Sequence, residues 1–172
     1  EATGAVRGQP ATLAQLERGA VKLLAAGLTR RSLVVSIGGG AVSDAAGFLA
    51  ATFMRGISWA AVPTTLLAMV DAAIGGKTAV NLPGAKNAVG AFHPPAAVLV
   101  DPAALATLPA RELRSGMGEV LKYAALRPEL LGRVSSLGRR APGPDLVAAC
   151  ARAKVEVVRR DPTEQGERKL LN

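Results

Sequence analysis

The feature that most constrains this chain is a short β-branched run, LVVSI at residues 33–37, which passes directly into three glycines. A run of this length and composition predicts a buried strand. Further strand-like runs occupy residues 57–62 and 97–101, and segments of helical spacing or composition occupy residues 12–27 (with Thr12 as N-cap), 41–54 and 64–73. Because strands that alternate with helices form βαβ units, we expect an α/β fold with a Rossmann-like parallel sheet.

The second half of the chain has a different pattern. Residues 110–126, 129–137 and 145–160 all have helical character, the last with Asp145 as the expected N-cap. This run of helices predicts an all-α region after the sheet, so we place an α/β domain at residues 1–105 and the start of a helical domain at residues 106–172. Within the α/β domain, before the third strand-like run, the turn formers of NLPGAKNAVGAFHPP predict a loop over residues 81–95.

Composition limits the class of partner and the compartment. The net charge is +8, but the basic residues are scattered and only 3% of residues are aromatic, which favours a small anionic substrate over a nucleic acid. The longest uncharged run, residues 56–70, is too short for a membrane span and contains Pro63. The single cysteine, Cys150, excludes an intrachain disulfide and a cysteine-rich zinc site, and indicates a reducing, cytoplasmic location.

The three glycines suit a turn between a strand and a helix. Such a turn lets the backbone approach a phosphate, and the N-terminus of the helix supplies N–H donors. The spacing matches neither G-x-G-x-x-G nor the P-loop pattern, however, so a tight turn without a ligand remains an equal alternative. Asp44 has two interpretations as well: an acid in the first turn of a helix, favoured by the helix dipole, or an acceptor for ribose hydroxyls or amide groups.

A set of polar residues follows in the middle of the chain. Asp71 stands alone after the stretch TTLLAMV, so as a buried acid it needs a cation or several hydrogen-bond donors. Lys77, six residues on across the Gly75-Gly76 turn, is a natural candidate. The pair could simply fix a loop, or it could belong to a site lined with ammonium groups for an anionic substrate.

A second carboxylate, Glu119, stands three residues before Lys122 on an expected helix, either as an exposed ion pair or as a metal-binding carboxylate. The only histidine, His93, is expected to be a turn or packing residue. The chain therefore lacks the three His or Cys ligands that a catalytic zinc site usually has.

Five segments in one unbroken order resemble the 3-dehydroquinate synthase family, shikimate-pathway members of the sugar-phosphate cyclase superfamily. They are GGGAVSDAAGFLAATFMRG, VPTTLLAMVDAAIGGKTAVN, AKNAVGAF, TLPARELRSGMGEVLKY and RKLLN, and the resemblance covers roughly residues 27–172. The GGKT that follows VDAAI is more similar to this family than to the relatives that make deoxy-inosose or valiolone products.

The resemblance implies an NAD-dependent lyase that also needs zinc or cobalt. It would convert 3-deoxy-arabino-heptulosonate 7-phosphate to 3-dehydroquinate and inorganic phosphate. NAD would transiently oxidise the C5 hydroxyl, phosphate would be eliminated, the ketone would be reduced again, and ring opening would precede an intramolecular aldol closure. The metal would act as a Lewis acid.

The resemblance also implies roles for individual residues. The NAD pyrophosphate and ribose segment matches Gly38, Gly39, Gly40 and Asp44, and further NAD contacts match Thr64, Thr65, Lys86, Thr107 and Leu108. Substrate-binding or catalytic positions match Arg55, Asp71, Lys77, Asn87, Lys122, Lys154, Arg168 and Asn172, and the metal-ligating carboxylate matches Glu119. The basic groups would hold the phosphate and carboxylate of the substrate.

The match covers the central part of the family pattern. The family's first strands and the histidines that follow LLN have no counterpart here, and RGQPAT at residues 7–12 stands where the family has Gly-Glu and a lysine. We therefore expect an incomplete metal site and no cyclase activity from these 172 residues alone. The resemblance also implies a homodimer. The alternatives are a related cyclase, a metal-dependent polyol dehydrogenase, and a non-catalytic nucleotide-binding module.

Overall fold

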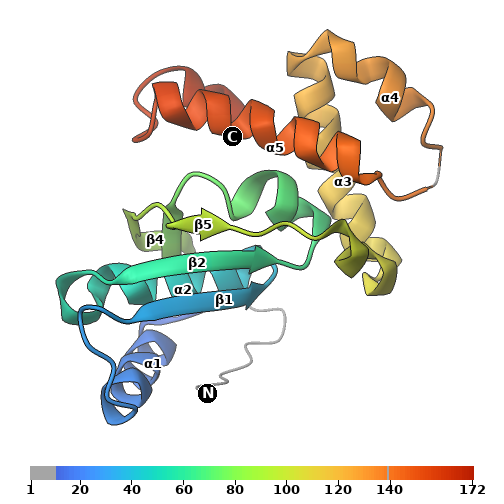
Figure 1. Cartoon of the computed structure of the whole chain (residues 1–172). Coiled ribbons are helices and arrows are strands. Elements are labelled where there is room, and N and C mark those ends of the chain that lie inside the picture. Colours follow the sequence, from blue (N-terminus) through green and yellow to red (C-terminus); the bar gives the residue numbers. More distant parts are fainter. Residues whose placement is uncertain (1–10, 139) are drawn as a thin grey trace.

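The computed structural model describes residues 11–138 and 140–172, so most of RGQPAT lies outside it. In these ranges a parallel sheet of order β1-β2-β5 lies at the centre (Figure 1). Its strands are β1 (Leu33–Gly38), β2 (Ser58–Pro63) and β5 (Ala97–Val98). Helix α2 (Gly40–Thr52) packs against the sheet and α1 (Leu13–Ala25) packs on α2. The expected α/β fold with a parallel sheet is confirmed.

Local sequence explains where these elements begin and end. Thr12 caps α1 as predicted, because its hydroxyl accepts from the N–H of Gln15 while the Gln15 side chain accepts from the N–H of Thr12. Strands β1 and β2 follow the predicted runs and pair in register from Leu33 opposite Ser58. Strand β5 is shorter than the predicted residues 97–101, because Asp101 then caps a 3-10 helix that Pro102 begins.

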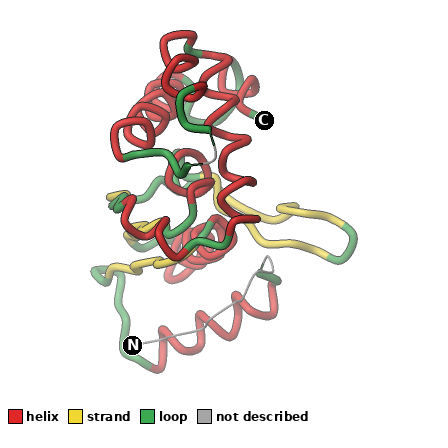
Figure 2. The backbone as a smooth tube through the Cα atoms, turned by 90° about the vertical axis from the view of Figure 1, so that its right-hand side faces the viewer, coloured by secondary structure: helices red, strands yellow, loops and turns green. Residues whose placement is uncertain are grey.

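The predicted loop over residues 81–95 is wrong, because most of it belongs to an antiparallel hairpin. Strand β3 (Lys77–Leu82) pairs with β4 (Ala85–Phe92), and the hairpin extends away from the body of the molecule (Figure 2). The turn formers mark only its tip, where Gly84 has a φ of +79°. Between Val80 and Leu82 the register shifts, and Asn87 on the opposite strand has a left-handed φ of +49°.

The helical region after the sheet is present as predicted, with altered details. It comprises η3 (Pro102–Thr107), α3 (Ala110–Leu126), η4 (Pro128–Leu130), α4 (Leu131–Ser135), α5 (Pro144–Arg160) and η5 (Glu167–Leu171). The predicted helix 129–137 is therefore split into a 3-10 turn and a short α-helix. The N-cap of α5 is Gly143, and Asp145 lies in the first turn, where an acid still favours the helix dipole.

The segment between β2 and β3 packs against both the sheet and the helical region. It contains the π-helical turn η2 (Ala68–Ala72), and a 3-10 turn, η1 (Phe53–Arg55), precedes β2. Leu66, Met69 and Val70 of this segment belong to the core of the helical region, whereas Ala68 and Ala73 belong to the core beneath the sheet. One short segment thus contributes to two apolar cores.

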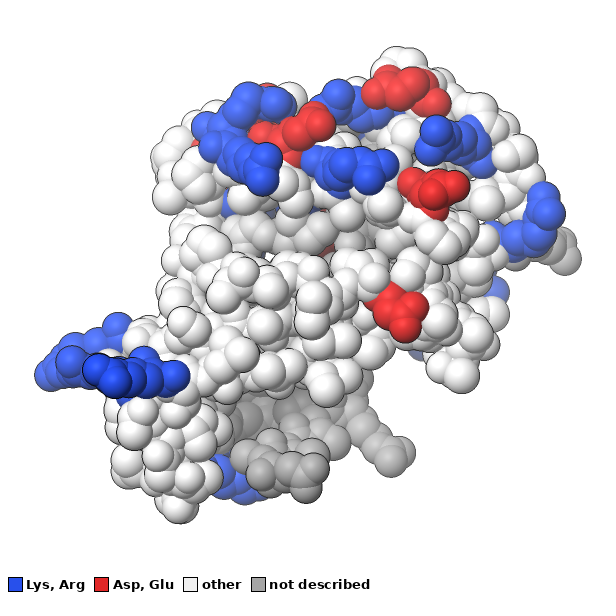
Figure 3. Space-filling view, in the orientation of Figure 1, with Lys and Arg blue, Asp and Glu red and all other residues white. Residues whose placement is uncertain are grey.

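Part of the sheet is uncovered in the region that the structure describes. Leu33, Val35 and Ile37 of β1 are each more than half exposed, and uncharged side chains cover the middle of the face seen in Figure 3. Lys and Arg gather with acids over the helical part of that face. Among the described residues, no helix combines the length and apolar character needed to cross a membrane.

Candidate functional site

Asp71 is the meeting point of three elements. It lies on the π-helical turn η2, and its Oδ1 atom accepts hydrogen bonds from Lys154 Nζ of α5 at 2.7 Å and from the Tyr123 hydroxyl of α3 at 2.8 Å. Lys122 Nζ, also on α3, lies 3.6 Å from the same oxygen. A π-helical turn is rare and occurs often at functional sites, so its position here singles out Asp71.

The pKa values of this cluster follow from burial and charge. Burial alone would raise the pKa of Asp71, but Lys154, Lys122 and the Tyr123 hydroxyl together lower it. Burial also lowers the pKa of Lys154, and the nearby charge of Asp71 offsets this lowering only in part. The carboxylate is therefore ionised at neutral pH, held by cations that are themselves largely removed from water.

The prediction that Lys77 is the partner of Asp71 is wrong. The Gly75-Gly76 turn that separates them has φ values of +100° and +68° and carries Lys77 onto β3, away from η2. Lys77 Nζ instead donates to Asn172 Oδ1 at 2.9 Å and forms an ion pair with Glu164.

Glu164 organises a second cluster, and the sequence analysis missed it. Besides its ion pair with Lys77, it accepts from Asn172 Nδ2 at 2.6 Å, and its Oε2 lies 3.7 Å from Arg168 Nε. The cluster thus brings together three of the residues that the resemblance assigns to substrate. The lowered pKa of Glu164, which Asn172, Lys77 and Arg168 produce against the opposing effect of burial, keeps it ionised. DPTEQGERK holds three acids and two basic residues, so the sequence offered no signal that singles out Glu164.

Arg168 is fully buried and its guanidinium group bonds to backbone carbonyls. It donates to Gly75 O at 2.8 Å and to Pro162 O at 2.6 Å, which ties the C-terminal segment to the Gly75-Gly76 turn. The Asp161 carboxylate shapes this segment by accepting from the N–H groups of Gln165, Gly166 and Arg168. Asp161 is therefore a second residue of this region that sequence reasoning did not identify.

The glycine turn lies at the carboxyl ends of β1 and β2. Gly39 is the N-cap of α2 and no side chain caps this helix, so its first N–H groups remain available. A Cβ atom on Gly38, Gly39 or Gly40 would lie 2.8–3.0 Å from Val42, Thr65 or Ala72. The glycines are thus required by close packing within the chain, and the uncapped helix end is what fits a pyrophosphate.

Three further predicted NAD contacts lie at or beside this turn. Thr64 N–H donates to Gly38 O at 2.9 Å, and Thr65 Oγ1 accepts from Ala68 N–H at 3.2 Å. Asp44 lies in the second turn of α2 rather than the first, and burial, with Asp71 nearby, raises its pKa to about 7. An acid with that pKa can accept or donate a hydrogen bond near neutral pH.

Glu119 and Lys122 form an ion pair on α3, one of the two predicted alternatives, but the pair is partly buried rather than exposed. Lys122 Nζ also donates to Leu171 O at 2.6 Å. Over residues 11–138 and 140–172, however, His, Cys, Asp and Glu do not assemble into any group of three that could hold a metal ion. His93 is a packing residue as expected: its ring Nε2 lies 2.9 Å from Ile57 O. These residues fit one carboxylate ligand of a metal, not a complete site.

The remaining predicted residues lie apart from Asp71. Lys86 and Asn87 are exposed near the hairpin tip, and Thr107 and Leu108 lie at the end of η3. Arg55 precedes β2, at the end of the sheet opposite to the glycine turn, and the six residues of this strand span roughly 20 Å. The structure of the single chain therefore does not bring Arg55 to the Asp71 cluster.

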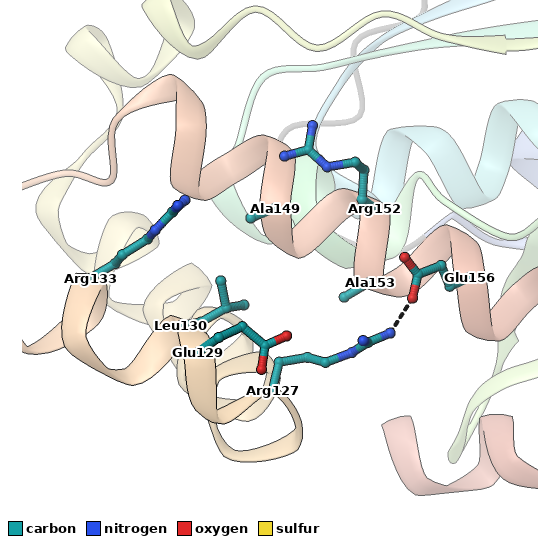
Figure 4. A pocket seen from close by; sticks show the side chains of 8 residues that line it. All are labelled: Arg127, Glu129, Leu130, Arg133, Ala149, Arg152, Ala153 and Glu156. Carbon is teal, nitrogen blue, oxygen red and sulfur yellow. Dashed lines mark hydrogen bonds and ion pairs between the residues drawn. The ribbon is translucent and has the colours of Figure 1, made fainter.

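A cavity of about 280 Å³ lies elsewhere, on the helical region (Figure 4). Arg127, Glu129, Leu130, Arg133, Ala149, Arg152, Ala153 and Glu156 line it. Arg127, which follows the last residue of α3, forms an ion pair across it with Glu156 of α5. None of the residues assigned by the resemblance lines this cavity.

Comparison with known proteins identifies the group to which the chain is related. The family model of the 3-dehydroquinate synthase N-terminal region matches residues 7–115. The chain belongs to the 3-dehydroquinate synthase family. It is 53% identical over 153 residues to 3-dehydroquinate synthase of Xanthomonas axonopodis pv. citri (strain 306), a match that covers 85% of this chain and 41% of that protein. The resemblance drawn from the motifs is confirmed, and the chain spans about two fifths of the length of such relatives.

Solved structures agree with the family assignment. 2-Epi-5-epi-valiolone synthase from Streptomyces hygroscopicus subsp. jinggangensis 5008, with NAD+ and Zn2+ bound, superimposes with a TM-score of 0.80 at 34% identity, over 93% of this chain and 47% of its own. A 2-deoxy-scyllo-inosose synthase complexed with carbaglucose-6-phosphate, NAD+ and Co2+ gives a TM-score of 0.81 at 28% identity, over 98% and 47%. These related cyclases share the arrangement of sheet and helices found in this family member.

Proposed function

We propose that this chain carries the cofactor-binding and part of the substrate-binding machinery of a 3-dehydroquinate synthase. The reaction is the conversion of 3-deoxy-arabino-heptulosonate 7-phosphate to 3-dehydroquinate and phosphate. The observation that carries the proposal is the Asp71 cluster, in which Lys154, Tyr123 and Lys122 converge on one carboxylate beside the glycine turn. Membership of the family supports it further.

The chain's own residues would divide the work by charge. The uncapped end of α2 would hold the NAD pyrophosphate, and Asp44 would accept from ribose hydroxyls. Lys77, Lys122 and Lys154 would hold the phosphate and carboxylate of the substrate, and Asn172 would complete this set. Arg168 would position the C-terminal segment through its bonds to backbone carbonyls, and the substrate roles of Arg55 and Asn87, which lie apart from the Asp71 cluster, stay predictions. Bound NAD would supply the reversible acceptance of hydride.

Glu119 would supply one ligand to a zinc or cobalt ion, which would polarise substrate oxygens. Lys122, its present partner, would then be released to the substrate. The other ligands are not among the described residues, so we assign no step to the metal.

The finer features of the proposal concern class and assembly. We propose a phosphate-eliminating carbon–oxygen lyase that acts as a cytoplasmic homodimer on a small anionic sugar phosphate, without nucleic-acid or membrane partners. The domain division at residue 105 also stays a prediction. Size-exclusion chromatography with light scattering tests the homodimer.

NAD+ binding tests the proposed function most directly. We expect the chain to bind NAD+ in calorimetry, and Asp44→Ala to weaken that binding at least tenfold because it removes an acceptor for ribose hydroxyls. Lys22→Gln, which removes an exposed charge of α1, is the matched control. If the wild-type chain binds no NAD+, or if both variants bind equally, the assignment of the glycine turn is wrong.

Product formation tests the reaction class. Since the described residues offer one metal ligand, we expect the 172-residue chain alone to release no phosphate from the heptulosonate phosphate. Accumulation of NADH with a polyol would indicate a dehydrogenase instead. Formation of dehydroquinate by the chain alone would overturn the expectation of an incomplete site.

A further inference from the structure

The hydroxyl of Tyr123 has a specific and unusual partner. Tyr123 is the single tyrosine of the chain, it is 1% exposed, and its ring belongs to the core of the helical region. Its hydroxyl donates to Asp71 Oδ1 at 2.8 Å across 52 residues of sequence. A buried tyrosine hydroxyl needs a hydrogen-bond partner. A buried carboxylate is an expensive partner, because removing its charge from water costs free energy even when Lys154 pairs with it, so its presence here indicates a functional role.

We propose that Tyr123 is a positioning residue, which fixes the Asp71 carboxylate so that its second oxygen, Oδ2, faces a hydroxyl group of the bound cofactor or substrate. The proposal rests on the proposed function, because the ligand must carry hydroxyl groups. The residue acts through Asp71 and need not touch the ligand itself.

The distribution of donors around Asp71 carries this inference. Tyr123, Lys154 and Lys122 all approach Oδ1, at 2.8, 2.7 and 3.6 Å. A carboxylate oxygen offers about two lone-pair sites, so Oδ1 is filled. In residues 11–138 and 140–172 no hydrogen bond or ion pair reaches Oδ2. The Asp71 side chain is 22% exposed, so a ligand can approach it. The acceptor left for a ligand is therefore Oδ2.

A tyrosine suits this role better than a third lysine would. Lysine side chains are flexible, and Lys122 also contacts Glu119 and Leu171 O, so it can leave Asp71 when a substrate arrives. The Tyr123 ring is held by core packing and stays in place. Burial, together with the nearby carboxylates Asp71 and Glu119, also raises the pKa of Tyr123, so the hydroxyl keeps its proton and remains a donor.

The first test removes one oxygen atom. Tyr123→Phe preserves the ring in the core, and we expect the pKa of Asp71, followed by carboxyl carbon NMR, to rise because the charged form loses a hydrogen bond. Asp71→Asn assigns the resonance. Cys150→Ala, a change in the same core without a contact to Asp71, is the control for a merely structural effect. An unchanged titration of Asp71 in Tyr123→Phe overturns the proposal.

The reverse measurement does not require the phenylalanine variant to fold. Because Tyr123 is the single tyrosine, tyrosinate absorbance reports this residue alone. In Asp71→Asn the charge that opposes its ionisation is gone, so we expect absorbance to appear at a lower pH than in the wild-type protein. Identical alkaline titrations in the two proteins would show that the side chains are not coupled.

Ligand binding separates this inference from the proposed function. With NAD+ as probe, we expect Tyr123→Phe to bind about tenfold more weakly than wild type and Cys150→Ala to bind equally well. If the wild-type chain binds no NAD+, the proposed function fails and the two titrations alone decide the role of Tyr123. If the titrations shift but Tyr123→Phe binds both NAD+ and the heptulosonate phosphate as tightly as wild type, the positioning role is wrong.

Discussion

Two aspartates near the glycine turn have opposite surroundings, and at the scale of single residues this difference sets their chemistry. Asp71 has Lys154 within 2.7 Å, and its pKa is lowered despite burial. Asp44 has no ion-pair partner among the described residues, and burial followed by the charge of Asp71 raises its pKa to about 7. Environments that separate the pKa values of two acids allow one to stay charged while the other exchanges a proton.

The raised pKa of Asp44 predicts a pH-dependent gain of stability in Asp44→Asn. Between about pH 4 and about pH 7 the folded protein binds the Asp44 proton more tightly than the unfolded chain does, so the contribution of Asp44 to stability falls as pH rises through this window. Removing the charge should therefore stabilise the protein on the order of 2 kcal/mol at about pH 8 and leave it nearly unchanged at about pH 4. Urea unfolding at the two pH values measures the difference.

Comparison between variants isolates this effect from the other acids. Asp71 and Glu164 have lowered pKa values, so their contributions are lost as pH falls and affect wild type and Asp44→Asn alike. Glu17→Gln, on the exposed side of α1, removes the same charge and should show no such pattern. If Asp44→Asn raises the free energy of unfolding equally at both pH values, the raised pKa of Asp44 is wrong.

At the scale of elements, the glycines of two helices have different roles. A Cβ atom on Gly47 of α2 would lie 2.4 Å from Thr78 Cγ2 and 2.9 Å from Trp59 Cζ2, so this glycine lets the helix approach β3 and the sheet. Gly118 of α3 would meet nothing within 4 Å. Gly116, on the same helix, lies against Leu66 and the backbone of Leu67, which brings α3 close to the segment that carries Asp71.

This difference predicts opposite effects of one substitution. Gly47→Ala should destabilise the protein by about 1–3 kcal/mol, because the added methyl group overpacks the contact between α2 and β3. Gly118→Ala, the matched control, should stabilise it by up to about 1 kcal/mol, because an exposed glycine inside a helix costs conformational entropy. Thermal or urea unfolding measures both. Equal effects of the two substitutions would show that α2 does not pack closely against β3 and the sheet at Gly47.

At the scale of the whole molecule, the segment from Thr64 to Ile74 couples the sheet to the helices. Its residues alternate between the two cores: Leu66, Met69 and Val70 on one side, Ala68 and Ala73 on the other. Asp71 adds the bonds to α3 and α5. If either core unfolds, this segment loses its packing and the other core loses the residues that the segment contributes to it. We therefore expect the two halves to unfold together.

Two intrinsic probes test this coupling. Trp59, the single tryptophan, belongs to the core beneath the sheet, and Tyr123 belongs to the helical core. Their urea transitions should share one midpoint, and Leu66→Ala, expected to cost about 2–5 kcal/mol, should lower both midpoints equally. Val21→Ala, at an exposed position of α1, is the control. Separate midpoints, or a shift confined to Tyr123, would contradict the shared segment.

Local sequence determined most of the secondary structure. β-branched runs, glycine turns and the cap at Thr12 act between near neighbours, and the strands and longer helices followed them. The hairpin was missed because its small, exposed β4 residues form a strand by pairing with β3, a long-range requirement that turn formers concealed. The family resemblance added residue roles that periodicity does not contain.

Tertiary structure alone decided which polar groups meet. Sequence proximity suggested Lys77 for Asp71, but the backbone of Gly75-Gly76 turns Lys77 away to Glu164, and α5 brings Lys154 from 83 residues further along the chain. Tyr123 and Glu164 also contact their partners only because the fold brings distant segments together. A buried charge takes the partner that the packing of helices delivers, and its distance along the chain has no influence on that choice.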